Sequence, residues 1–159
     1  MQTDSPAKPG PEAGFTLIEL FVVLLIVAAL AGVALATFLG QQRKAYAASA
    51  EQLASEAEIT AEEIATANGG RWGEGGRSFL SPTELHALEP AIPISSRAGG
   101  GGGAWVSEAR AIEEGKGYEL TVVSASNPQE SFTVRRLADG SVQRSCAPVD
   151  PAGGCTGSW

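Results

Sequence analysis

The residues whose types could do chemistry are few, and the clearest of them are two cysteines near the C-terminus. Cys146 and Cys155 bound the segment CAPVDPAGGC, whose prolines and glycines let a short loop turn back on itself. In an exported protein such a pair favours a disulfide, which would stabilise the fold by roughly 2–3 kcal/mol. Two isolated cysteines make a poor zinc site, because structural zinc takes four ligands.

The remaining candidates for chemistry lack the partners that catalysis needs. His86, the only histidine, lies in a short predicted helix without an evident nucleophile beside it. The five glycines Gly99–Gly103 lack the Lys-Ser/Thr context of a phosphate loop. We therefore expect no enzyme activity, no cofactor and no metal site.

Length and charge exclude further classes of protein. A chain of 159 residues suits one domain, and no part of it is rich in Lys or Arg. With a net charge of −7, it lacks the basic footprint of a nucleic-acid binder. An acidic surface is typical of solubility outside the cell rather than of binding to anionic lipid.

The N-terminal region contains a polar leader followed by a long apolar segment. Residues 1–14 are polar and proline-rich, which predicts a disordered leader. Leu20 to Leu39 contain neither charge nor proline, and at about 1.5 Å per residue they span a hydrocarbon layer of about 30 Å. Residues 15–40 are therefore predicted to be a transmembrane helix.

Glu19 is the unusual residue of that segment. A carboxylate at the centre of a membrane helix costs roughly 2.5–3.5 kcal/mol, and less towards an interface, so such residues are usually paired or functional. The simpler interpretation places Glu19 at the headgroup level, where a negative charge suits the start of a helix.

Helical periodicity continues after the apolar run. Residues 41–68 are predicted to be the amphipathic half of the same helix, with the stop at Asn68-Gly69-Gly70. Their weakly apolar stripe consists of Tyr46, Ala50, Leu53, Ala57, Thr60, Ala61 and Ile64. One helix from about Phe15 to Ala67 would be about 80 Å long. The alternative is a membrane anchor followed by a separate short helix.

Residues 69–159 are predicted to form a small, loop-rich head. Ser81-Pro82-Thr83-Glu84 matches a capping box that opens a short helix through about Glu89. Strand-forming runs follow at Trp105–Val106, Tyr118–Val123, Ser131–Leu137 and Ser141–Cys146, with a hairpin signal at Asp139-Gly140. The predicted fold is α+β: a long N-terminal helix packed on a small antiparallel sheet.

The heptapeptide Gly14-Phe15-Thr16-Leu17-Ile18-Glu19-Leu20 resembles the prepilin-peptidase signature of type IV pilins and type II secretion pseudopilins. This resemblance implies cleavage after Gly14 and N-methylation of the new Phe15 amine. It also implies that Glu19 partners the N-terminal amine of a neighbouring subunit during assembly. The cysteine pair resembles the disulfide-bounded C-terminal loop of many pilins.

The function that this resemblance implies is structural. The chain would be a prepilin, held in the inner membrane by a single span and then assembled into an extracellular helical filament of identical subunits. Its other partners would be the prepilin peptidase/methyltransferase and the pilus or secretion assembly platform, with no direct binding of nucleic acid.

Some features depart from the family pattern. Many pilins carry a proline within the apolar run, where this chain has Ala36, and the leader has only Lys8 whereas Arg43 and Lys44 follow the span. Taken alone, these charges favour the opposite orientation; the resemblance places the leader in the cytoplasm.

Other functions remain as alternatives to a pilus subunit. Within the family these are a type II secretion pseudopilin and a minor or DNA-uptake pilin. Outside it, Ala34-Leu35-Ala36 fits a signal-peptidase site of a conventional secreted protein, although the apolar run is longer than usual. A membrane-anchored enzyme is the remaining alternative, and the head lacks a convincing nucleophile–base pair for it.

Overall fold

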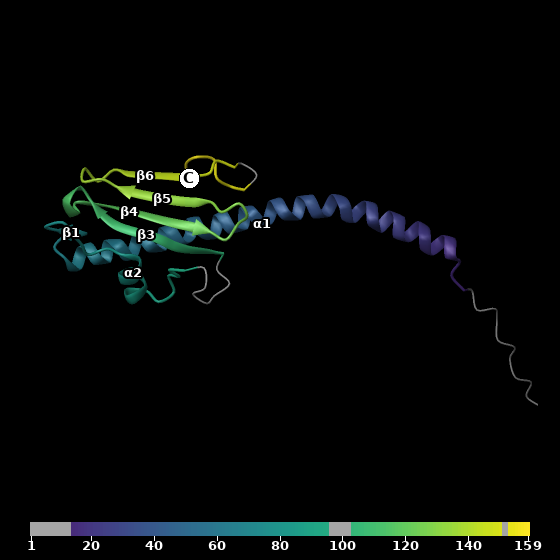
Figure 1. The fold of residues 1–159 in the computed structure, drawn as a ribbon, viewed down its shortest axis with the longest axis horizontal. Coiled ribbons are helices and arrows are strands. Elements are labelled where there is room, and N and C mark those ends of the chain that lie inside the picture. The colour runs from purple at the N-terminus through teal and green to yellow at the C-terminus, as the bar shows by residue number, and fades with distance from the viewer. Residues whose placement is uncertain (1–13, 96–102, 151–152) are drawn as a thin grey trace, which may run out of the picture. The chain divides into compact units, whose positions relative to one another are not determined.

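The computed structural model describes residues 14–95, 103–150 and 153–159 (Figure 1). Of the predicted leader only Gly14 is among them, and most of the predicted glycine loop lies outside them. The chain divides into two units, Met1–Thr37 and Phe38–Trp159. The helix α1 (Leu17–Ala67) begins in the first unit and ends in the second.

The end of α1 lies where the sequence predicts it. The side-chain amide of Asn68 donates to the Ile64 carbonyl at 2.7 Å, and the Gly70 N–H donates to the Ala65 carbonyl at 2.7 Å. Gly69 and Gly70 both have positive φ, at 69° and 84°, which glycine adopts without a steric penalty. These bonds satisfy carbonyls that the last turn of a helix leaves without partners.

The second unit combines two short helical elements with two antiparallel sheets. Strands β1 (Gly73–Glu74) and β2 (Arg77–Ser78) form a small hairpin, which the helix α2 (Pro82–Leu88) follows. The larger sheet has the order β3-β4-β5-β6, with every neighbouring pair antiparallel. Its strands are β3 (Ala104–Ile112), β4 (Gly117–Ser124), β5 (Ser131–Arg136) and β6 (Val142–Ala147), and the 3₁₀ turn η1 (Glu113–Gly115) joins the first two.

The second half of α1 covers one face of this sheet, as the sequence predicts. Small side chains line the helix side of the interface, and larger ones line the sheet side. The helix contributes Ala47, Ala50, Leu53, Ala54, Ala57, Ala61, Ile64 and Ala65, and the sheet contributes Val106, Tyr118, Leu120, Val122, Phe132 and Val134. In Figure 1 this part of α1 runs behind the strands. The predicted α+β architecture, a long helix packed on a small antiparallel sheet, is therefore confirmed.

Two arginines of the sheet connect α1 to the last strands. Arg136 of β5 pairs with Glu62 of α1 and lies 5.3 Å above the centre of the Trp72 ring. The Trp72 indole N–H donates to the Ala61 carbonyl at 2.8 Å, so this ring also contacts the helix. Trp72 is therefore buried in this interface.

A second arginine repeats the arrangement one strand further on. Arg144 of β6 pairs with Glu58 of α1 at 2.7 Å and lies 5.4 Å above the ring of the C-terminal Trp159. Trp159 in turn meets Phe132 edge-on, with the ring centres 6.1 Å apart. The end of the chain is therefore part of the packed interface.

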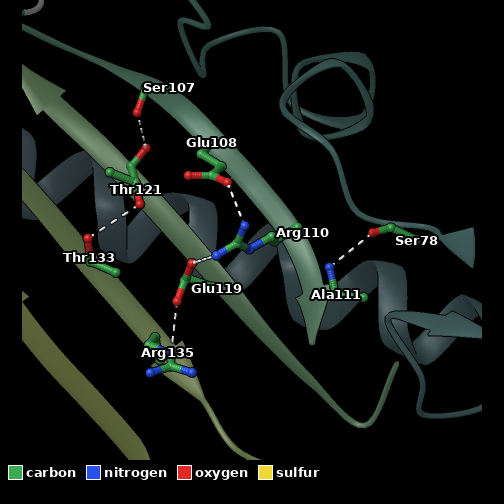
Figure 2. Close-up of polar contacts among 9 residues, drawn as sticks. All are labelled: Ser78, Ser107, Glu108, Arg110, Ala111, Glu119, Thr121, Thr133 and Arg135. Carbon is green, nitrogen blue, oxygen red and sulfur yellow. Dashed lines mark hydrogen bonds and ion pairs between the residues drawn. The ribbon is translucent and has the colours of Figure 1, made fainter. Parts of the chain in front are cut away.

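One predicted strand was too short. The sequence predicts only Trp105–Val106 as the first strand, whereas β3 extends to Ile112. In its second half Glu108 and Arg110 are exposed and carry the polar contacts that Figure 2 shows, whereas Ala109 between them is buried in the core. There Arg110 pairs with both Glu108 and Glu119, and cross-strand pairs of this kind stabilise a solvated face.

The hairpin β1–β2 lies where no strand was predicted from the sequence. Gly75 and Gly76, both with positive φ, form its two-residue turn. Paired glycines are a known signal for such turns. Hydrogen bonds hold the hairpin to the main sheet, since the Ala111 N–H donates to the Ser78 hydroxyl at 3.0 Å (Figure 2).

Candidate functional site

The N-terminal segment begins with two exposed residues. Phe15 is 80% exposed, and apart from the chain neighbours no described residue lies within 4 Å of the position that a Cβ on Gly14 would occupy. The peptide bond between Gly14 and Phe15 precedes the first residue of α1. The predicted cleavage point therefore lies outside the helix, and cleavage there stays a prediction.

The start of α1 is a capping box formed by Thr16 and Glu19. The Thr16 N–H donates to Glu19 Oε2 at 3.0 Å and the Thr16 hydroxyl donates to the same oxygen at 2.8 Å, while the Glu19 N–H donates back to the Thr16 hydroxyl at 3.3 Å. These bonds satisfy N–H groups that the first turn of a helix leaves unpaired, and such caps contribute about 0.5–2 kcal/mol.

Sequence reasoning missed this cap, although the signal Thr-x-x-Glu was present. Glu19 therefore caps the start of its own helix. This agrees with the simpler interpretation, in which a negative charge suits the start of a helix. Both Thr16 bonds go to Oε2, and in the part of the chain that is described Oε1 takes no further hydrogen bond. The predicted assembly role of Glu19 stays a prediction.

The first half of α1 is an uncovered apolar surface. From Leu20 to Leu39 the large apolar side chains are between 49% and 71% exposed. They are Leu20, Phe21, Val22, Val23, Leu24, Leu25, Ile26, Val27, Leu30, Val33, Leu35, Phe38 and Leu39. Soluble monomers rarely expose an apolar patch of this extent, so some apolar partner must cover it. By length and composition this helix is able to cross a membrane.

The two cysteines form the disulfide that the sequence favours. Cys146, in β6, is bonded to Cys155 with the Cα atoms 5.6 Å apart. Both residues are buried, and the Cys146 N–H donates to the Gly157 carbonyl at 3.1 Å, which adds the C-terminal tail to the edge of β6. Both thiols are therefore committed to a structural bond.

Among the described residues no group of three or more His, Cys, Asp or Glu side chains is arranged to hold a metal ion. His86 has a structural contact, since its Nδ1 lies 2.8 Å from the Ile92 carbonyl. That bond connects α2 to the segment that leads towards β3.

Comparisons of the chain with models of protein families, with curated proteins and with solved structures found no match. The resemblance to type IV pilins therefore stays a prediction, based on the heptapeptide from Gly14 to Leu20, on the apolar helix that follows it and, more loosely, on the helix-then-sheet architecture.

Proposed function

We propose that this chain is a prepilin: a structural subunit of a type IV pilus or related filament, cleaved after Gly14 and assembled from the inner membrane through α1. The observation that carries the proposal is that α1 is one continuous helix from Leu17 to Ala67. The signature residues stand directly before an uncovered apolar run, and the same helix then becomes the cover of the sheet.

Before assembly, the apolar half of α1 would lie in the hydrocarbon layer. Leu20 to Leu39 match a thickness of about 30 Å at about 1.5 Å per residue. In the filament the same surface would contact the helices of other subunits. Lipid tails are as apolar as leucine, so this exchange depends on close packing. Ala28, Ala29, Ala31 and Gly32 are small enough to permit it.

Glu19 would select the register of one helix against the next. Cleavage after Gly14 creates an ammonium at Phe15, and a neighbouring subunit can present that charge to Glu19. Because Thr16 occupies only Oε2, Oε1 is able to accept a hydrogen bond from the ammonium while the helix cap persists. A carboxylate that is paired in this way avoids much of the penalty of lying among apolar side chains.

The head would form the outside of the filament. Its disulfide suits an oxidising compartment beyond the inner membrane, and the net charge of −7 suits exposure to solvent. The chain's function would then be mechanical, without a catalytic step of its own.

The first test is the N-terminus and intact mass of this chain in shed surface filaments and in the membrane fraction. A start at Phe15 with one added methyl group, and a mass two hydrogens below the reduced value, would support the proposal. A start at Thr37 would refute it in favour of a conventional secreted protein. An intact Met1 in every fraction would show that the signature is not processed.

The assembly role of Glu19 needs a matched pair of variants. Glu19→Gln keeps the size of the side chain and removes its charge, and Glu56→Gln makes the same change at an exposed site of the second half of α1. We expect normal cleavage of both, and at least tenfold fewer filaments for Glu19→Gln alone.

A knockout that loses protein secretion instead of pili would identify a pseudopilin.

A further inference from the structure

A groove that carries both signs of charge lies at the C-terminal end of α1. Its volume is about 410 Å³, and its walls come from the last turns of α1, from β2 and from α2, which Figure 1 shows beside this end of α1. Each wall contributes one charged side chain: Glu63 of α1, Arg77 of β2 and Glu84 of α2. The volume lies within the range of small-molecule sites in proteins, about 300–1,000 Å³.

Arg77 differs from the other arginines that the structure describes. Each of the others forms an ion pair with a carboxylate. Among the described residues Arg77 has no such partner, although two carboxylates line the same groove. The carboxylates of Glu63 and Glu84 also form no ion pair and accept no hydrogen bond from a described residue. The three charges therefore share one groove without neutralising one another.

Contacts with the rest of the head hold the three walls in place. The side chain of Leu85 is fully buried in the core and anchors α2. The Ser78 hydroxyl connects β2 to the main sheet by accepting a hydrogen bond from the Ala111 N–H, and the Asn68 amide caps the last turn of α1. Binding of a ligand would therefore not have to order the walls first, which lowers its cost.

Apolar side chains line the groove together with these charges. Ile64 of α1 belongs to the core, Phe79 packs against that core, and Leu88 of α2 is 55% exposed. Such side chains gain free energy when an alkyl chain displaces water from them. The groove therefore suits a ligand that combines charges of both signs with an apolar body.

We propose that this groove binds a basic amino acid of the lysine type. At neutral pH such a molecule carries two ammonium groups, one carboxylate and an alkyl chain. The guanidinium of Arg77 binds the carboxylate, to which its planar donors are matched. Glu63 and Glu84 bind the ammonium groups, and the apolar side chains cover the alkyl chain. This inference concerns the head alone and does not depend on the chain being a pilus subunit.

The test uses three probes with alkyl chains of similar length. L-lysine carries all three charged groups, norleucine lacks the side-chain ammonium, and cadaverine lacks the carboxylate. We would titrate each probe into isotope-labelled full-length protein in an uncharged detergent at neutral pH and low ionic strength, because salt screens exposed charges. The NMR shifts of the backbone amides report both the affinity and the place of binding.

We expect the wild type to bind lysine at least about tenfold more tightly than norleucine or cadaverine. Arg77→Gln should remove the preference over cadaverine, and the double variant Glu63→Gln/Glu84→Gln should remove the preference over norleucine. Arg135→Gln and Glu56→Gln make the same changes at exposed residues outside the groove, so both preferences should persist in these controls.

Three results would overturn the proposal. One is cadaverine that binds the wild type as tightly as lysine does, because an acidic protein would then be attracting any cation. Another is a set of shifts that spreads over the surface instead of clustering at the groove. The third is the absence of saturable binding at millimolar lysine. All three are measured on the wild type, so the proposal is tested even where a variant misfolds.

Discussion

The alanines of α1 that face the sheet set how closely the helix approaches it, and Ala57 tests this directly. Ala57 is fully buried, as are Ala50, Ala54 and Ala61 along the same face. Leucine at position 57 places three more carbon atoms where the sheet side of the interface already holds large side chains. Overpacking of this kind typically costs 1–3 kcal/mol, and a domain is stable by only about 5–15 kcal/mol in total.

The measurement is urea unfolding of the full-length protein in detergent, followed by tryptophan fluorescence, since Trp72 lies at this interface. Ala48→Leu is the matched control, because Ala48 is exposed on the same helix and alanine and leucine have similar helix propensities. We expect Ala57→Leu to lower the free energy of unfolding by about 1–3 kcal/mol, and Ala48→Leu to change it by less than about 0.5 kcal/mol. Equal effects of the two substitutions would refute close packing of α1 on the sheet.

Two further predictions concern the head. The buried Tyr118 hydroxyl lacks a partner among the described residues, so Tyr118→Phe should raise the free energy of unfolding by up to about 1–3 kcal/mol; a loss instead would reveal a water-mediated bond. Gly115 and Gly140 have φ of 84° and 85°. A Cβ at Gly115 would lie 1.8 Å from the Gly73 carbonyl oxygen, whereas a Cβ at Gly140 would have no described residue other than its chain neighbours within 4 Å. In thermal unfolding, Gly140→Ala should lose about 1–2 kcal/mol and Gly115→Ala distinctly more; similar losses would contradict the close approach of η1 to β1.

The sequence predicts most of the architecture because its signals are local. The length of the uncharged apolar run identifies the first half of α1. Apolar residues that recur every three or four positions identify the helix face that covers the sheet. Phe132 and Val134 alternate with polar residues, and both are buried as that alternation predicts. The turn at Asp139-Gly140 also lies where the glycine is needed.

The features that the sequence analysis missed depend on neighbours that are distant in the chain. In the second half of β3 charged residues alternate only with the small Ala109 and Ala111, which is a weak strand signal, and the place of this segment in the sheet depends on pairing with β4. The sequence around Glu130 does not indicate that this glutamate is buried, because Gly153, which lies against its carboxyl group, is distant in the chain. The capping role of Glu19 is different, because its signal, a threonine followed three residues later by a glutamate, is local.

The pairing of α1 with the end of the chain has a consequence for folding. Glu62 and Glu58 find their arginines 74 and 86 residues later, and the interface also includes the final Trp159. Contacts this distant in sequence form late, because a long loop must close first. During synthesis the helix is complete before the strands that pack on it, so its alanine-lined face stays uncovered until those strands have been made. A chain that stops before Arg144 would lack the pair with Glu58 and the contact between Phe132 and Trp159, so the interface would stay incomplete, and incompletely packed chains are natural targets for chaperones and proteases.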